Sequence, residues 1–198
     1  MSSDFAPGII KNMKTLKLTK SDFKKGDSYY STYIGKEIEI DADVSVEIEG
    51  NLGWVFFDRL YVKGSIFAEA GTGIKAGWGI KAGTGIKAGW GIEAGEGIEA
   101  GEGIEAGTGI EAGWGIEAGL SITCRLTLKV VYRVFAGVCY WRQMVDDESK
   151  TITCGKFEGG VVEYGILKET GLPDKKKTLC GKIVKVEIDG EKYEATIN

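Results

Sequence analysis

Isoleucine and alanine recur with a period of six through the middle of the chain, and this pattern predicts its architecture. Residues 71–118 are eight uninterrupted copies of the hexad Gly-x-Gly-Ile-x-Ala, in which Ile-x-Ala alternates apolar and polar positions as a short β-strand does. A six-residue period is too short for helical or propeller repeats, whose units span roughly 20 to 50 residues. An α-helix is excluded because each of the sixteen glycines would cost about 1 kcal/mol in its interior. We therefore expect a parallel β-solenoid in which Ile-x-Ala forms strands and Gly-x-Gly turns corners.

The same alternation predicts which side chains face solvent. The Ile and Ala of each hexad should point inward and stack as an apolar ladder, whereas the residue between them should point outward. This outward position holds Lys75, Lys81, Lys87, Glu93, Glu99, Glu105, Glu111 and Glu117. The corner position between the two glycines holds Thr72, Trp78, Thr84, Trp90, Glu96, Glu102, Thr108 and Trp114.

The number of hexads in one coil stays open at this point. In a coil of two hexads, Trp78 would stack on Trp90 at a spacing of about 4.8 Å along the axis. In a coil of three hexads, as in three-sided solenoids, Trp78 would stack on Glu96 and Trp114 instead. The sequence also leaves open whether these indoles are exposed or packed beneath neighbouring segments.

The segments on either side of the repeat also read as β-structure. Period-two alternation predicts strands at 37–40 and 44–49 and one long half-buried strand from Ile122 to Val134. A hairpin is expected from Lys182 to Ile197, with a type I′ turn at Asp189-Gly190.

Repeat arrays need terminal segments that cover the ends of their core. We therefore expect an all-β protein in three parts: a β-rich cap (1–65), a hexapeptide-repeat solenoid (66–124) and a C-terminal β-rich cap with the hairpin (125–198). The caps are expected to be mainly antiparallel.

The net charge of −4 is concentrated on the repeat, which carries seven Glu and three Lys (3 − 7 = −4), so the flanks balance. The N-terminus lacks the basic and apolar regions of a secretory signal, and no segment approaches the roughly 20 apolar residues of a membrane span. The four widely spaced cysteines are expected to be buried, reduced thiols. A cytoplasmic location and no membrane association are expected.

Histidine is absent from the chain, and this excludes several kinds of chemistry. Neither Ser-His nor Cys-His nucleophile activation nor histidine metal ligation is available. A catalytic acid needs a distinct environment, whereas a repeated glutamate ladder gives every carboxylate similar surroundings. The Gly-x-Gly pairs open no helix, so they are not phosphate-binding loops. We expect no enzyme activity, no catalytic residues, no metal site and no cofactor.

Isoleucine at every sixth position resembles the hexapeptide-repeat family of β-solenoid proteins, which includes acyltransferases and cytoskeletal polymers. The resemblance implies the solenoid but not the acyl transfer, because the catalytic histidine of those enzymes has no counterpart here. The chain departs from that pattern at the small residue expected two places before the aliphatic one, since Trp or Glu occupies five of eight such slots. The run also looks like the Gly-Ile-Glu-Ala-Gly-Trp repeats of uncharacterised bacterial and prophage proteins.

These observations favour a non-enzymatic binding protein that presents an acidic and aromatic solenoid face to a protein partner with a basic surface. A column of carboxylates can imitate a nucleic-acid backbone, which suggests a phage-type inhibitor of a nucleic-acid-binding host defence enzyme. Direct nucleic-acid binding is not expected, because the acidic surroundings repel phosphate. Alternatives are a self-assembling scaffold, which would be a homo-oligomer, and an enzyme with carboxylate-based chemistry. The expected partner-binding residues are Glu93, Glu96, Glu99, Glu102, Glu105, Glu111, Glu117, Trp78, Trp90 and Trp114.

Overall fold

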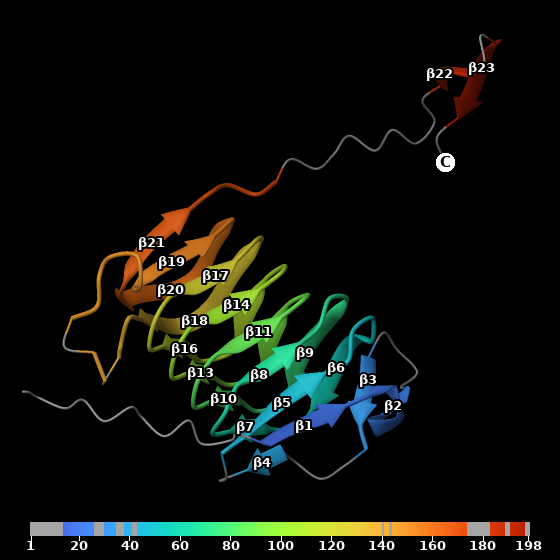
Figure 1. Cartoon of the computed structure of the whole chain (residues 1–198). Coiled ribbons are helices and arrows are strands. Elements are labelled where there is room, and N and C mark those ends of the chain that lie inside the picture. Colours follow the sequence, from blue (N-terminus) through green and yellow to red (C-terminus); the bar gives the residue numbers. More distant parts are fainter. Residues whose placement is uncertain are drawn as a thin grey trace, which may run out of the picture.

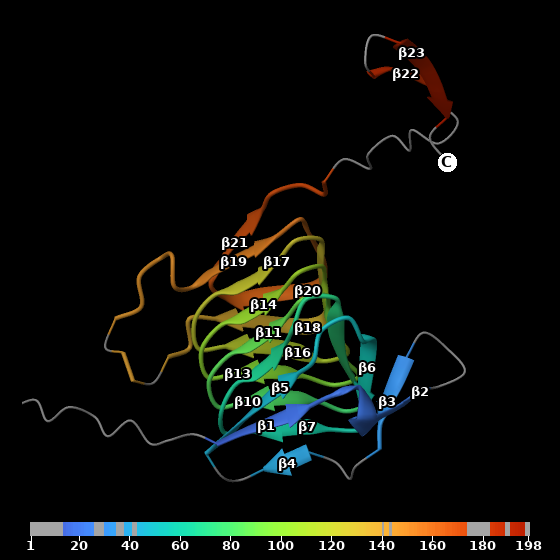
Figure 2. The same cartoon turned by 45° about the vertical axis from the view of Figure 1, so that its right-hand side comes forward.

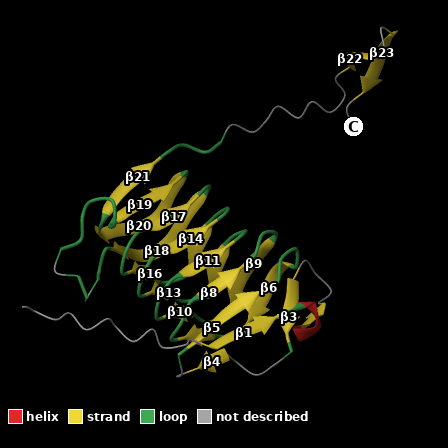
Figure 3. Ribbon diagram, viewed as in Figure 1, coloured by secondary structure: helices red, strands yellow, loops and turns green. Residues whose placement is uncertain are grey.

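Parallel strands wind into a column of about seven turns, as expected for a β-solenoid (Figures 1 and 2). The computed structural model describes residues 14–25, 30–34, 38–40, 43–139, 141–142, 144–173, 183–188 and 191–196, with backbone only at 30, 40, 183–188 and 191–196. Within these residues, the one helical segment is the single 3₁₀ turn η1 (Lys20–Asp22), and all other regular structure is β (Figure 3).

Each coil of the repeat contains three hexads. Ile80 pairs in parallel register with Ile98, and Ile98 with Ile116, so stacked residues occupy the same position of every third hexad. The coils before the repeat are slightly longer, since Leu60 lies beside Ile80. The coil length that the sequence left open is therefore three hexads within the repeat.

Three hexads per coil give the column three faces, each a stack of parallel strands. Face one contains β3 (Tyr30–Tyr33), β6 (Gly53–Phe57), β9 (Thr72–Ala76), β12 (Ile92–Ala94), β15 (Ile110–Ala112) and the first half of β18 (Thr127–Ala136). Face two contains β4 (Ile38–Ile40), β7 (Leu60–Val62), β10 (Ile80–Ala82), β13 (Ile98–Ala100), β16 (Gly115–Ala118) and the second half of β18. Face three contains β1 (Lys14–Leu18), β5 (Val44–Ile48), β8 (Ile66–Ala68), β11 (Ile86–Ala88), β14 (Ile104–Ala106), β17 (Ile122–Cys124), β19 (Thr151–Cys154) and β21 (Ile166–Glu169).

The core is the expected ladder of isoleucine and alanine. Every Ile of the eight hexads is at most 2% exposed and every Ala at most 6%. Burying one such isoleucine stabilises the fold by about 1.5–3 kcal/mol, so the eight together dominate the hydrophobic contribution of the repeat.

The two glycines of a hexad have different roles. A Cβ on Gly95, the first glycine of its hexad, would lie 2.1 Å from the carbonyl oxygen of Gly77 in the preceding coil. A Cβ on Gly97, the second glycine, would meet only the Gly115 oxygen at 3.4 Å. Close coil stacking therefore requires glycine at position 95, whereas Gly97 leaves room for a side chain.

The terminal segments are mixed rather than mainly antiparallel. Among the described residues, the antiparallel pairs are β2 (Phe23–Lys25) with β3, and β22 (Ile183–Ile188) with β23 (Glu191–Thr196). The other flanking strands continue the parallel column, and the pairing of β5 with β8 and of β17 with β19 crosses the expected boundaries at 65/66 and 124/125. The flanks extend the solenoid because their apolar residues repeat the inward pairs of the hexads.

The long strand expected from Ile122 to Val134 is divided in two, so that prediction is wrong. A corner at Arg125 and Leu126 separates β17 from β18, and Leu126 is exposed instead of buried. The six-residue period continues here and overrides the period of two, since the pairs Ile122/Cys124, Leu128/Val130 and Val134/Ala136 are all buried.

The two ends of the column differ. At the N-terminal end, the rings of Phe23, Tyr33 and Phe57 pack together with centroid separations of 5.4–5.8 Å and cover the first coils. At the C-terminal end, the last strands are β20 (Lys156–Tyr164), which pairs with β18, and β21, and Leu167 is 38% exposed.

The C-terminal hairpin is confirmed. Strands β22 and β23 are antiparallel, and Ile188 pairs with Glu191 across a two-residue connection. The connecting residues 189–190 lie outside the described residues, so the type I′ turn stays a prediction.

Candidate functional site

Exposed aromatic side chains line one corner of the column, between faces one and two. One residue of each coil lies at this corner, in the order Asp58, Trp78, Glu96, Trp114 and Tyr132. From Trp78 onward, the backbone amide of each residue donates a hydrogen bond to the carbonyl oxygen of the residue before it in this order, at 2.8–3.0 Å. We call the column of these five residues the aromatic corner. It follows directly from the coil of three hexads, which places Trp78 beneath Glu96 and Glu96 beneath Trp114.

The indoles of the aromatic corner point to solvent. Trp78 is 53% exposed, Trp114 58% and Tyr132 62%. The Arg59 guanidinium lies over the rings of Tyr61 and Trp78, at 5.4 and 5.6 Å from the ring centroids. The sequence left exposure of the indoles open, and the structure shows that they are exposed.

The ten expected partner-binding residues do not gather on one surface. Trp78, Glu96 and Trp114 share the aromatic corner, but Trp90 lies on another corner with Thr72 and Thr108, and Glu102 on the third corner with Thr84. The outward glutamates are divided among the faces: Glu93 and Glu111 on face one, Glu99 and Glu117 on face two, and Glu105 on face three.

Four of the seven repeat glutamates form ion pairs with lysines of an adjacent coil. Lysine nitrogens lie 2.5–2.9 Å from carboxylate oxygens in Lys75–Glu93, Lys81–Glu99, Lys87–Glu105 and Lys129–Glu111. Because these pairs are partly exposed, each stabilises the fold by at most about 1 kcal/mol. Their main consequence is that the acidic ladder is largely neutralised. Glu96, Glu102 and Glu117 form no ion pair with another described residue.

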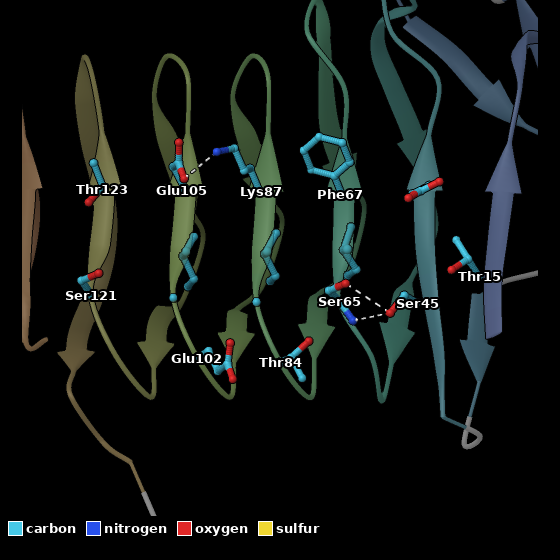
Figure 4. A pocket seen from close by; sticks show the side chains of 16 residues that line it. Thr15, Ser45, Ser65, Phe67, Thr84, Lys87, Glu102, Glu105, Ser121 and Thr123 are labelled. Atoms are coloured by element: carbon cyan, nitrogen blue, oxygen red, sulfur yellow. Dashed lines mark hydrogen bonds and ion pairs between the residues drawn. The ribbon is translucent and has the colours of Figure 1, made fainter. Parts of the chain in front are cut away.

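A groove of about 860 Å³ runs along face three (Figure 4). Two rows of side chains border it, one on the strands and one at the corner between faces two and three. The row on the strands contains Glu47, Phe67, Lys87, Glu105 and Thr123, and the corner row contains Thr84 and Glu102. The floor between the rows consists of Gly85 and Gly103, in register with Ser45, Ser65 and Thr15 on one side and with Ser121 on the other.

Most polar groups of the groove are hydroxyls with few protein partners. Ser45 Oγ accepts hydrogen bonds from the Ser65 amide at 3.1 Å and from its hydroxyl at 3.2 Å. Thr84 Oγ1 is buried and has no hydrogen-bond partner among the described residues. The Lys87–Glu105 ion pair at 2.9 Å lies along the row on the strands. The groove thus offers unused hydrogen-bonding capacity with little net charge.

Sequence reasoning missed this groove. Its hydroxyls come from segments far apart in the chain, from Thr15 to Thr123, and no local motif joins them. The available signal was positional, since Ser65 and Ser121 occupy the place that Gly85 and Gly103 hold in the hexads.

Two thiols are buried in adjacent coils. Cys124 in β17 and Cys154 in β19 are free, as is the half-buried Cys139, whereas Cys180 lies outside the described residues. Burial is the main cause that raises the pKa of Cys124 to about 12 and the pKa of Cys154 above its ordinary value. Both thiols are therefore protonated at neutral pH and are poor nucleophiles. The described part of the chain contains no group of three or more His, Cys, Asp or Glu arranged to hold a metal ion.

The chain matches no model of a known protein family, no curated protein and no solved structure. The fold and the surface define it as a parallel β-solenoid. Among the described residues there is no helix with the length and apolar character needed to cross a membrane.

Proposed function

We propose that this chain is a non-enzymatic binding protein whose rigid solenoid presents the aromatic corner to a protein partner. The observation that supports the proposal is the exposure of Trp78, Trp114 and Tyr132 in one column. Trp and Tyr are enriched among the residues that contribute most to protein interfaces. Backbone hydrogen bonds hold the column in place, so little conformational entropy is lost when a partner binds.

The charges around the aromatic corner favour a partner with a basic surface. Glu96 lies between Trp78 and Trp114, and Glu117 lies on the adjoining face two, both without an ion pair among the described residues. Carboxylates at the rim of an interface mainly affect the association rate and partner choice. Cytoplasmic location and kinship with hexapeptide-repeat solenoids are part of this proposal, the latter because the hexads form three-sided coils.

A narrower form of the proposal is a phage-type inhibitor that occupies the nucleic-acid site of a host defence enzyme by charge mimicry. The ion pairs reduce its support, because they leave only Glu96, Glu102 and Glu117 without a described ion pair among the repeat glutamates. Replacement of Glu93, Glu99 and Glu105 by Lys, together with a salt titration, tests this form. Binding that is insensitive to salt, or that survives the replacement, contradicts mimicry.

A second candidate is a self-assembling scaffold, which the C-terminal end of the column favours. Strands β20 and β21 are the last of their sheets among the described residues, and Val161, Tyr164 and Ile166 are 40–59% exposed there. Unpaired strand edges are templates for association with another chain. Light scattering at increasing concentration should show polymers if the scaffold is correct and one defined species if it is not.

The primary proposal is tested by capture of partners from a lysate of the source cells on the immobilised full-length chain. We expect the variant Trp78→Ala/Trp114→Ala to lose the retained protein, because it removes both indoles of the aromatic corner. Trp90→Ala is the matched control, since it removes an indole of similar exposure from a different corner. Equal retention by the double variant and the wild type, measured by quantitative mass spectrometry, would contradict the proposal.

A further inference from the structure

We infer that the groove on face three is a binding site for an extended, uncharged glycan chain. This site is separate from the aromatic corner and does not depend on the function proposed for that corner. Four features support it: the length of the groove, its floor, its hydroxyl lining and its charge.

The groove is long, as an extended ligand requires. Its lining residues come from six neighbouring strand levels, from Thr15 beside β5 to Thr123 in β17. Five steps of about 4.8 Å between parallel strands give a length of about 24 Å. Figure 4 shows the lining side chains in two rows that follow this direction.

The floor is bare although a Cβ there would meet one tight contact and not the overlap found at Gly95. A Cβ on Gly85 or Gly103 would approach only backbone or side-chain oxygen of the next coil, at 3.3 Å or more, and neither residue has a positive φ. Serine occupies the same position in neighbouring coils, at Ser65 and Ser121. The missing side chains therefore keep the groove open.

Flat rings occupy three of the equivalent glycine positions on the other two faces. The Trp54 indole lies over Gly73 and Gly91, where an added Cβ would be 2.7–2.9 Å from ring atoms. The Tyr61 ring lies over Gly79 in the same way. On face three no ring of a described residue covers Gly85 or Gly103, so a flat ligand ring can rest on this floor.

The walls and the two ends of the floor provide the hydrogen bonds that sugar hydroxyls need. Thr15, Ser45, Ser65, Thr84, Ser121 and Thr123 each carry a hydroxyl that can donate and accept. The buried Thr84 Oγ1, which has no partner within the described part of the chain, costs free energy in the isolated protein. Because Thr84 lines the groove, a rotation about χ1 lets this hydroxyl bond a ligand. Phe67, 36% exposed, adds an apolar surface for the face of a sugar ring.

The charge of the groove disfavours anionic ligands. Lys17 pairs with Glu47 at 3.2 Å and Lys87 with Glu105 at 2.9 Å, which leaves Glu102 as the carboxylate without an ion pair among the described residues. Anionic polymers such as nucleic acids are repelled by this remaining charge. A peptide strand is also disfavoured, since β8, β11 and β14 are paired on both sides and offer no edge for strand addition.

The test is a nitrogen-15 NMR titration of the full-length chain with three linear hexasaccharides. These are the β-1,4-linked glucose, α-1,4-linked glucose and β-1,4-linked N-acetylglucosamine hexamers. We expect saturable shifts of the Gly85, Gly103 and Thr123 amides with at least one hexamer. A hexameric Ser/Ala peptide is the comparison ligand. No groove shifts with any hexasaccharide at millimolar concentration, or groove shifts with the peptide alone, would overturn the inference.

Variants locate the site. Gly85→Leu fills the floor and should weaken binding by at least about 10-fold, or 1.4 kcal/mol. Gly97→Leu is the matched control, because its Cβ meets similar space on face two, and it should leave affinity unchanged. Thr84→Val should weaken binding without lowering the melting temperature, and this keeps the inference testable if Gly85→Leu fails to fold. Unchanged affinity in Thr84→Val, or an equal loss in Gly97→Leu, would contradict the assigned position.

Discussion

Gly95 and Gly97 flank the same corner residue, and alanine at these two positions should have opposite effects on stability. A Cβ on Gly95 would lie 2.1 Å from the Gly77 carbonyl oxygen, far inside van der Waals contact. A Cβ on Gly97 would find its nearest atom, the Gly115 oxygen, at 3.4 Å. The pair therefore differs in steric environment while sharing sequence context and residue type.

The expected loss of stability in Gly95→Ala follows from the shift that the added Cβ forces on its coil. To make room in Gly95→Ala, the coil has to shift by about 1 Å, since a close-packed interior cannot absorb the overlap. This shift strains the hydrogen bonds from Gly95 N to Ala76 O (3.0 Å) and from Glu96 N to Trp78 O (2.8 Å). Two weakened bonds at about 1 kcal/mol each and overpacking of about 1–3 kcal/mol give a loss of about 3–5 kcal/mol.

Gly97→Ala should stabilise the protein by about 0.4–1 kcal/mol, because alanine restricts the unfolded chain without straining the folded one. Urea unfolding followed by circular dichroism measures both free energies of unfolding, and thermal unfolding provides a second readout. For a chain of this size, the loss in Gly95→Ala corresponds to a melting temperature lower by at least about 6 °C. Equal destabilisation by the two variants would refute the reasoning, because the clash arises only if Gly77 lies one coil before Gly95.

Three further predictions concern a hydroxyl, a thiol and an ion pair. Thr84→Val should raise the free energy of unfolding by about 1 kcal/mol, because it removes a buried hydroxyl without a described partner; a decrease in urea unfolding would contradict this. Burial raises the pKa of Cys124 to about 12, so the folded state holds this proton more tightly and wild-type stability should fall as pH rises from about 9 towards 12. Cys124→Ala, which restores the residue of the hexads, should show a smaller fall, and identical pH profiles would contradict the assignment. Lys81→Ala should cost less than about 1 kcal/mol, because the Lys81–Glu99 pair is half-exposed; a larger, salt-independent loss would refute this.

The inward ladder could be predicted from the sequence because each hexad encodes it directly. Ile and Ala alternate with one polar residue, and every such pair in 71–118 is buried. The number of hexads per coil could not be predicted, since identical hexads are compatible with coils of two or three. That choice depends on packing among faces and not on any single hexad.

The ion pairs and the groove could not be predicted for the same reason. Lys81 and Glu99 are three hexads apart, so their contact becomes evident only when the coil length is known. The net charge of the repeat could therefore be counted from the sequence, but the ion pairs that neutralise most of its glutamates could not be predicted. The groove unites Thr15 with residues up to Thr123, and its hydroxyls have no common local motif.

The most direct test of this account is a distance measurement between outward positions one coil apart. Nitroxide labels at Lys87→Cys and Glu105→Cys, in a chain whose native cysteines are replaced by Ala, would occupy paired positions in β11 and β14. We predict strong dipolar broadening in the electron paramagnetic resonance spectrum of this pair. We predict weak broadening for Lys87→Cys with Glu99→Cys, which are two hexads apart and on different faces. The reverse result would contradict the three-faced column, and with it the aromatic corner and the groove.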